Sequence, residues 1–135
     1  MRAASKRFFD TNVLLYLLSA DLAKARRAER LLAGGGRVSV QVLNEFASVA
    51  SRKLRMAVAE IRECLGPIRS LCGVEPLTAD THTLGLEVAE RYGYSVYDSM
   101  IVAAALLAGC DTLYSEDLHH GQRIEGMRIR SPFAS

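Results

Sequence analysis

Short apolar segments alternate with longer segments of helical periodicity along this chain, and this alternation is the strongest constraint on its fold. The apolar segments predict strands, at 7–9, 37–40, 74–77, 112–115 and 127–131. The intervening segments predict helices, at 12–19, 21–33, 41–54, 58–71, 79–92 and 98–108. Strands separated by helices pair in parallel through right-handed crossovers. We therefore expect an α/β fold, a three-layer sandwich in which helices flank a central parallel β-sheet.

Length and composition agree with one globular domain. Of the 135 residues, 50% are hydrophobic and 24% are charged, which is a globular composition, and we expect a single domain over residues 1–135. No apolar run approaches the roughly 18 residues that span a bilayer. We therefore expect a soluble, cytoplasmic protein with no membrane partner.

The basic residues are mostly arginines, although the net charge of +2 is too small to indicate nucleic-acid binding by itself. Two arginine-rich segments stand out, at 24–30 and 51–55. Guanidinium groups bind phosphates in a bidentate manner, so either segment could contact a nucleic acid. The alternative, which the sequence leaves open, is that both are solvated helix faces.

The stretch FFDTNVLLYLL, residues 8–18, places the carboxylate of Asp10 beside apolar residues expected in the core. Asp, Thr and Asn are all favourable N-cap residues, so Asp10 could cap the helix expected at 12–19. Alternatively, Asp10 lies at the carboxyl end of a central strand, where open α/β sheets bind their ligands. This stretch alone leaves both interpretations open.

Further acids lie near the buried faces of predicted helices and at another strand end. Asp98 precedes a series of apolar residues at the spacing of one helix face, so it takes the first position of a buried stripe. An unpaired charge there would cost several kcal/mol. Glu45 lies about 40° beyond Val49, at the border of an apolar helix face. The fourth acidic region, Glu116 and Asp117, follows the strand at 112–115.

Each acidic region lies at a strand end or in an early helical turn, which in a parallel α/β fold is one edge of the sheet. Carboxylates gathered there repel one another unless a cation neutralises them. Carboxylate oxygens are the ligands that Mg²⁺ and Mn²⁺ prefer. One such ion, or two about 3.5–4 Å apart, can activate water and stabilise charge on a phosphodiester. The pattern therefore favours metal-dependent phosphodiester hydrolysis.

The same four regions resemble the motifs of the PIN-domain nucleases, and within that family the VapC-type toxins of toxin–antitoxin pairs. The matching stretches are FFDTNVLLYLL, VSVQVLNEFASV, YSVYDSMIVAAALLAGC and LYSEDLHHGQ, in this order over nearly the whole chain. The resemblance implies an endoribonuclease that requires Mg²⁺ or Mn²⁺ and acts on RNA. It also implies the α/β fold expected above.

Carried over residue by residue, the resemblance assigns catalytic, metal-binding roles to four acids, Asp10, Glu45, Asp98 and Asp117. It implies that three polar residues hold these ligands and bound waters in place, Thr11, Asn12 and Ser115. Many relatives carry a second acid and an aromatic residue where this chain has Leu118 and His119. This departure leaves open whether Glu116 or Asp117 faces the metal, although Asp117 matches the pattern better. With Asp10 as a ligand, Asn12 becomes the better candidate for the helix cap.

Partners follow from the resemblance and from the helix expected at 12–19. This helix is apolar almost all round, so its outer face is either buried by neighbouring helices or left as an exposed groove. The resemblance implies that a small cognate antitoxin protein occupies such a groove and that the toxin forms a homodimer. Arginines near the site, Arg52 and Arg55, are expected to add salt-dependent affinity for RNA.

Other enzyme classes fit less well. A phosphatase of the haloacid dehalogenase type needs a second Asp where this chain has Asn12, and a receiver domain needs a late lysine, whereas Lys53 is the last lysine here. Two alternatives stay open. One is a PIN nuclease of RNA processing that is no toxin, and the other is a catalytically silent PIN-fold binding module.

Overall fold

The computed structural model describes residues 6–133, and the ends of the expected domain, residues 1–5 and 134–135, lie outside that description. The strands are β1 (Arg7–Phe9), β2 (Gly36–Ser39), β3 (Cys72–Glu75), β4 (Thr112–Tyr114), β5 (Arg123–Ile124) and β6 (Met127–Arg130). The helices are α1 (Thr11–Leu15), the 3-10 helix η2 (Tyr16–Leu18), α2 (Leu22–Ala33), α3 (Val40–Arg52), α4 (Val58–Leu71), α5 (Ala79–Tyr92) and α6 (Val96–Leu107). Within this range, no helix has both the length and the apolar character needed to cross a bilayer.

The described strands form one sheet in the order β3-β2-β1-β4-β6-β5. Their pairings are parallel except that of β5 with β6, so the expected α/β architecture is confirmed. The sequence analysis missed β5, which has only two residues and therefore shows no periodicity. Glu125 and Gly126 connect it to β6 with φ values of 49° and 88°, as in a two-residue hairpin turn.

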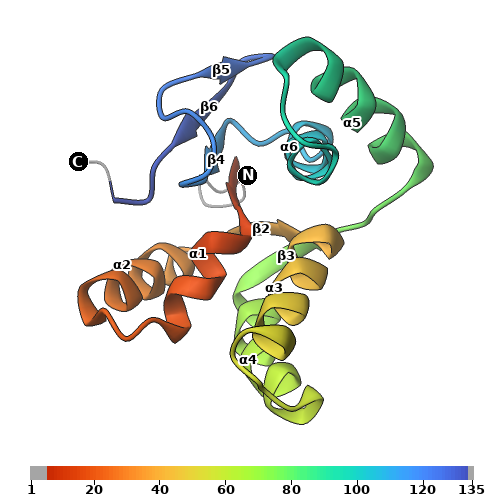
Figure 1. Ribbon diagram of the computed structural model, residues 1–135. Coiled ribbons are helices and arrows are strands. Elements are labelled where there is room, and N and C mark those ends of the chain that lie inside the picture. The colour runs from red at the N-terminus through yellow and green to blue at the C-terminus, as the bar shows by residue number, and fades with distance from the viewer. Residues whose placement is uncertain (1–5, 134–135) are drawn as a thin grey trace.

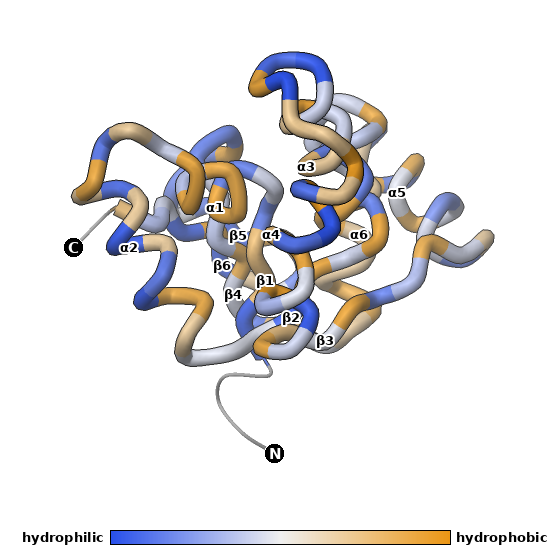
Figure 2. Tube along the Cα trace, turned by 90° about the horizontal axis from the view of Figure 1, so that it is seen from below, coloured by the Kyte–Doolittle hydropathy of each residue, from blue (hydrophilic) through white to orange (hydrophobic). Residues whose placement is uncertain are grey.

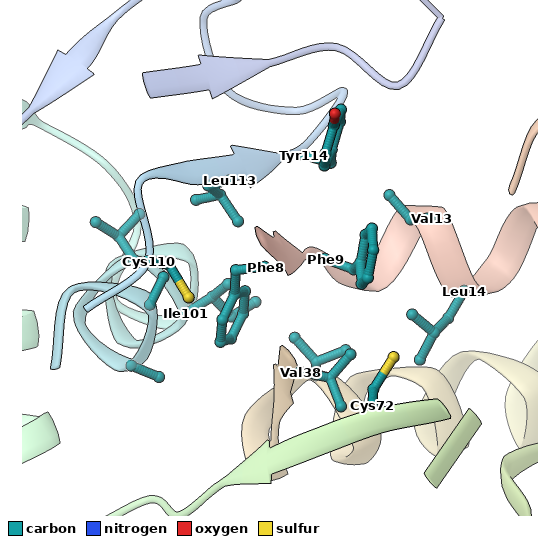
Figure 3. Close-up of a cluster of buried hydrophobic side chains, with 14 of the residues drawn as sticks. Phe8, Phe9, Val13, Leu14, Val38, Cys72, Ile101, Cys110, Leu113 and Tyr114 are labelled. Atoms are coloured by element: carbon teal, nitrogen blue, oxygen red, sulfur yellow. The ribbon is translucent and has the colours of Figure 1, made fainter. Parts of the chain in front are cut away.

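Helices cover both faces of the sheet. The pair α5 and α6 lies on one side, whereas α1, α2, α3 and α4 lie on the other (Figure 1). Successive residues of a strand point to opposite faces, and in β1 Phe8 points toward Ile101 of α6 while Phe9 points toward Val13 of α1 (Figure 3). Both rings are fully buried, so at β1 the hydrophobic core lies on both faces of the sheet.

The helices differ in how much of their surface is apolar. Hydrophobic residues run along most of α1 and α6, whereas α2 alternates between hydrophobic and hydrophilic residues (Figure 2). Burial follows this pattern, because residues 99–105 of α6 are all buried. In α2 the buried residues form a single stripe, Ala25, Ala28, Leu31 and Leu32. Thus α6 is an interior helix and α2 is an amphipathic helix at the surface.

Side-chain caps begin the two helices that carry Glu45 and Asp98. The Ser39 hydroxyl accepts a hydrogen bond of 3.2 Å from the Val42 N–H at the start of α3. The Ser95 hydroxyl accepts one of 3.1 Å from the Asp98 N–H at the start of α6. Such caps satisfy N–H groups that have no partner within the helix. They fix where each helix begins and therefore which residues occupy its early turns.

The first helical segment differs from expectation. It begins directly after β1 and Asp10, ends as α1 at Leu15, and continues as the 3-10 turn η2. Because no linker separates strand from helix, the capping position falls on Asp10, whose carboxylate accepts a 2.6 Å hydrogen bond from the Thr11 N–H. The assignment of the cap to Asn12 is therefore wrong, and Asn12 lies in the first turn. Elsewhere several boundaries differ from expectation by one or two residues; for example, β3 begins at residue 72 and α6 at residue 96.

The close approach of β2 to β1 predicts that Gly36→Ala destabilises the protein. A Cβ at this position would lie 2.6 Å from the Phe9 ring and 2.8 Å from the Arg7 carbonyl oxygen. Overpacking of this kind lowers the free energy of unfolding by about 1–3 kcal/mol, which urea denaturation measures. Gly66→Ala in α4 is the control, because its Cβ meets nothing within 4 Å and should raise stability by up to about 1 kcal/mol. Equal effects of the two substitutions would contradict this account.

Candidate active site

The pairing of β1 with β4 brings two of the predicted site residues side by side. Phe9 pairs with Tyr114, so the residues that follow, Asp10 and Ser115, leave the sheet at the same edge. The Ser115 hydroxyl donates to Asp10 Oδ2 at 2.6 Å, and the Asp10 N–H donates to the Tyr114 carbonyl at 3.0 Å. Asp10 thus lies at the carboxyl end of a central strand and also caps α1, so both interpretations of its position hold.

Asp10 is a buried acid, with only 2% of its surface exposed. Burial raises the pKa of its carboxyl from 3.8 to about 7. Hydrogen bonds from Ser115 and Thr11 oppose this increase in pKa, while the negative charges of Asp98 and Asp117 add to it. A carboxylate held in this way would be stabilised by a nearby cation.

Asp98 lies in the first turn of α6 and is half-buried. Burial raises its pKa, a hydrogen bond from Ser95 lowers it, and the negative charges of Asp117 and Glu45 raise it further. The position is the one expected from the sequence, at the start of the buried stripe of α6. Asp98 therefore shares its electrostatic environment with the other predicted acids.

Glu45 is half-buried on α3, and both of its carboxylate oxygens have side-chain donors. The Thr11 hydroxyl donates to Oε1 and the Gln41 amide donates to Oε2, each at 2.9 Å. The bond from Thr11 ties α3 to the start of α1, whereas the bond from Gln41 lies within α3. Thr11 therefore positions a predicted ligand, as expected, while Gln41 is an additional residue that was not expected.

The neighbouring acids Glu116 and Asp117 face different surroundings. The Tyr16 hydroxyl donates to the Glu116 carboxylate, and burial together with this bond raises the pKa of Tyr16. Asp117 instead lines the cleft described below, and its charge raises the pKa of both Asp10 and Asp98. The geometry therefore favours Asp117 as the acid that acts with the other three.

A cleft of about 590 Å³ opens at this edge of the sheet. Its lining includes residues from α1, α3, the start of α6 and the loop after β4, namely Thr11, Asn12, Leu15, Gln41, Asn44, Glu45, Ser48, Val49, Arg52, Tyr97 and Asp117. Among residues 6–133, no three His, Cys, Asp or Glu side chains converge as a preformed metal site. Of the predicted acids, Glu45 and Asp117 line the cleft, and the charge of Asp117 acts on Asp10 and Asp98.

Asn12 contributes to the cleft through its side-chain amide. Its Oδ1 accepts a 3.4 Å hydrogen bond from the Glu116 N–H, which connects α1 to the loop after β4. Its Nδ2 is buried and has no hydrogen-bond partner among the described residues. Asn12 therefore orients this loop rather than capping the helix.

A second hollow, the apolar groove, has a volume of about 370 Å³. It lies between η2, α2, α3 and α4 and is lined by Leu17, Leu18, Glu29, Leu32, Ala33, Phe46, Cys64, Pro67, Ile68 and Leu71. Val13 and Leu14 are buried in the core, whereas Leu17 and Leu18 are only half-buried at the groove. Of the two alternatives for the helix expected at 12–19, the exposed groove is therefore present.

Sequence reasoning missed three residues of the site. Gln41 precedes Glu45 by one helical turn, and that spacing is a detectable signal of contact. Tyr97 precedes Asp98 directly and lines the cleft, but an aromatic residue next to an acid has no distinctive pattern. Tyr16 contacts Glu116 across 100 residues of sequence, which no local pattern could reveal.

A model of the PIN domain matches residues 7–123 of the chain. The chain belongs to the PIN domain family. This confirms the resemblance to that family drawn from the four motifs. Among curated proteins, none matches the chain.

Solved structures of toxins have a similar fold. The Mycobacterium tuberculosis toxin VapC20, described as sarcin-ricin loop cleaving, is 25% identical over 81% of this chain and 88% of its own, with a TM-score of 0.66. A toxin–antitoxin complex from Klebsiella pneumoniae is 21% identical over 94% of this chain and 98% of its own, with a TM-score of 0.71. DNA-bound VapBC from Salmonella typhimurium is 21% identical with the same coverage and a TM-score of 0.69.

The raised pKa of Asp10 predicts how the stability of the metal-free protein depends on pH. Between pH 3.8 and about 7, the folded protein retains a proton on Asp10 that the unfolded chain has released. The free energy of unfolding should therefore fall as pH rises through this window, by up to about 1.4 kcal/mol per pH unit from this group. Asp98 acts in the same direction.

Asp10→Asn should make the free energy of unfolding depend less steeply on pH, because the amide does not titrate. An asparagine can still accept from the Thr11 N–H and donate to the Ser115 hydroxyl, so the fold should survive. Urea denaturation in EDTA at several pH values measures both slopes. Identical slopes for the wild type and the variant would show that Asp10 is not the titrating group.

Proposed function

We propose that this protein is a metal-dependent endoribonuclease and the toxin of a toxin–antitoxin pair. The observation that carries the proposal is the buried carboxylate of Asp10, next to a cleft whose walls carry Glu45 and Asp117. Burying an acid and raising its pKa to about 7 costs stability, and groups perturbed in this way cluster at functional sites. Membership of the PIN domain family and the similarity to VapC20 support the same function.

The residues around the cleft fit a divalent cation. They offer carboxylate oxygens and hydroxyl groups, which are the donors that Mg²⁺ and Mn²⁺ prefer. The charges of neighbouring acids already act on Asp10, and a cation would relieve that repulsion. The residues that would hold it are Asp10, Glu45, Asp98 and Asp117. When bound, the ion supplies an activated water and neutralises charge on the phosphodiester.

The protein's own side chains prepare this site by fixing the acids. Ser115 and the Thr11 N–H hold the two oxygens of Asp10, and the Thr11 hydroxyl and Gln41 hold those of Glu45. Groups that are oriented before substrate binds need little reorganisation during the reaction. Removing a donor that orients a ligand typically costs 10–100-fold in metal affinity or activity.

The proposed substrate is RNA with accessible single-stranded or loop segments. The cleft must admit a phosphate close to the acids, and unpaired strands deform to allow this. Exposed Arg52 on the cleft lining would add affinity that falls with salt. We place the protein in the cytoplasm, together with such RNA. Cleavage of double-stranded DNA at an equal rate would contradict this substrate class.

Asp98→Asn should abolish RNA cleavage while the fold survives. Loss of a proposed metal ligand should lower cleavage of mixed RNA in Mg²⁺ or Mn²⁺ by more than about 100-fold, since even loss of a residue that supports a ligand costs 10–100-fold. Without metal, stability should hold or rise because a repulsive charge is removed. Gel assays with and without EDTA measure the first effect, and urea denaturation measures the second.

Asp111→Asn is the matched control for that substitution. Asp111 is exposed and precedes β4, at the end of this strand opposite the cleft, so cleavage should persist. If the wild type leaves RNA intact in both metals, the binding-module alternative replaces the nuclease. If it cleaves RNA but does not harm its host, the RNA-processing alternative replaces the toxin.

We further propose that the apolar groove binds a small cognate antitoxin, and that the protein forms a homodimer. The groove exposes leucine side chains that have no covering element among the described residues, and exposed apolar grooves commonly accept amphipathic helices. The solved structures with a similar fold include a toxin–antitoxin complex and VapBC, which supports a partner of this kind.

Leu71→Glu should abolish the complex with the antitoxin. Leu71 lines the groove and is 48% exposed, so a charge there disfavours apolar contact without disturbing the core. Leu86→Glu on α5 is the matched control, with 46% exposure outside the groove. Co-expression with the small protein encoded next to the gene, followed by size exclusion, measures the complex and the dimer. A complex that survives Leu71→Glu would place the partner elsewhere.

A further inference from the structure

We propose that the Tyr97 ring is a stacking platform for one RNA base, and that the Arg52 guanidinium binds a neighbouring phosphate. This inference rests on the proposed ribonuclease function and specifies how the cleft holds its substrate. Both residues line the same cleft as Glu45 and Asp117. Together they form a nucleotide subsite next to the acids.

Tyr97 is unusual among the aromatic residues of this chain because 67% of its surface is exposed. It lies in the first turn of α6, directly before Asp98. The middle of the same helix, residues 99–105, is buried, so Tyr97 lies at the exposed end of α6 that borders the cleft. Val96 beside it is also 49% exposed. An exposed ring at the edge of a nuclease cleft can stack on any base, because every base has a π-face.

Arg52 lines the same cleft, on the polar side of α3. The residues that α3 contributes to the lining include a series at four-residue spacing, Asn44, Ser48 and Arg52, and this spacing puts them on one helix face. The Ser48 hydroxyl accepts a 3.1 Å hydrogen bond from Arg52 Nε, which orients the guanidinium. Among residues 6–133, Arg52 takes part in no ion pair. Its remaining N–H donors are therefore available to a phosphate.

Arg52 lies two helical turns beyond Glu45 on α3, about 10 Å along the helix axis. Its side chain reaches back one turn to Ser48, so the guanidinium lies closer to the acids than this rise. We assign it a phosphate adjacent to the one at the acids. The subsite requires a base that has left its stack, so it selects unpaired strands over duplexes.

The absence of tryptophan from this chain allows a direct optical test. Tyr97→Trp introduces a single tryptophan at the proposed platform, in an Asp98→Asn background that prevents cleavage in Mg²⁺. A single-stranded RNA of mixed sequence should quench its emission, and an abasic strand of the same length should not. Leu107→Trp is the matched control, because it places an exposed residue at the far end of the same helix, where RNA should leave the emission unchanged.

Affinities measured by fluorescence anisotropy with labelled RNA complete the test. Tyr97→Ala should weaken binding about ten-fold, whereas Tyr97→Phe should retain it because stacking needs only the ring. Arg52→Gln should weaken binding and reduce the slope of log affinity against log salt by about 0.7, the value for one single-strand phosphate. Arg26→Gln is the control, because Arg26 lies on the exposed side of α2 and outside the cleft lining. It removes the same single positive charge as Arg52→Gln and should change the affinity for RNA less.

The outcomes separate this subsite from the ribonuclease function. RNA that binds without quenching Trp emission at position 97, or that binds equally well after Tyr97→Ala, would overturn the subsite while cleavage by the wild type still supports the nuclease. If Tyr97→Phe and Tyr97→Ala lose the same amount of RNA affinity, the contact depends on the tyrosine hydroxyl, and the stacking platform is overturned. Quenching in a protein whose wild type cleaves no RNA would support the subsite and reject the nuclease. Absence of any RNA binding would overturn the subsite.

Discussion

The burial of Asp10 is the constraint on which the rest of the site depends. Its carboxylate is removed from water at the end of β1, and its oxygens are satisfied by the Ser115 hydroxyl and the Thr11 N–H. The Thr11 N–H is supplied by the next residue in the chain, whereas Ser115 is close enough to donate because β1 and β4 pair in parallel with Phe9 opposite Tyr114. The register of the central strands therefore decides whether a buried acid can be accommodated at this edge. Glu45 and Asp98 approach from helices that begin at the same edge, and Asp117 approaches from the loop after β4.

Much of this arrangement could be predicted from the sequence, because it follows from periodicity. The alternation of strands and helices predicted the α/β class, and the apolar residues after Asp98 placed it correctly at the start of a buried helix, although α6 buries all of residues 99–105 rather than one stripe. Glu45 likewise occupies the half-buried border of α3. These positions depend on local patterns of burial, which a helix or strand shows in its own residues. The roles proposed for the acids rest on the family resemblance, on the cleft that Glu45 and Asp117 line, and on the charges that act on Asp10 and Asp98.

What could not be predicted depends on contacts between distant segments. The cap of α1 was assigned to Asn12 because Asp10 was taken as a ligand, and the sequence does not show that α1 begins directly after Asp10. The pairing of Tyr16 with Glu116 distinguishes Glu116 from Asp117, a choice that the sequence pattern favoured but left open. The strand β5 was missed because two residues are too few for a periodicity and its pairing is set by a turn.

The 3-10 segment η2 belongs to two surfaces at once. Tyr16 donates to Glu116 beside the cleft and packs edge-on against Phe133, with ring centroids 4.8 Å apart, whereas Leu17 and Leu18 line the apolar groove. Consecutive residues of one short turn thus serve different neighbours, and no shift of the segment could preserve all of these contacts. Both surfaces therefore restrict the substitutions that this turn can accept during evolution. A change at Leu17 or Leu18 that adapts the groove to a new partner also affects the turn whose Tyr16 contacts Glu116, so this part of the groove is coupled to the loop that carries Asp117.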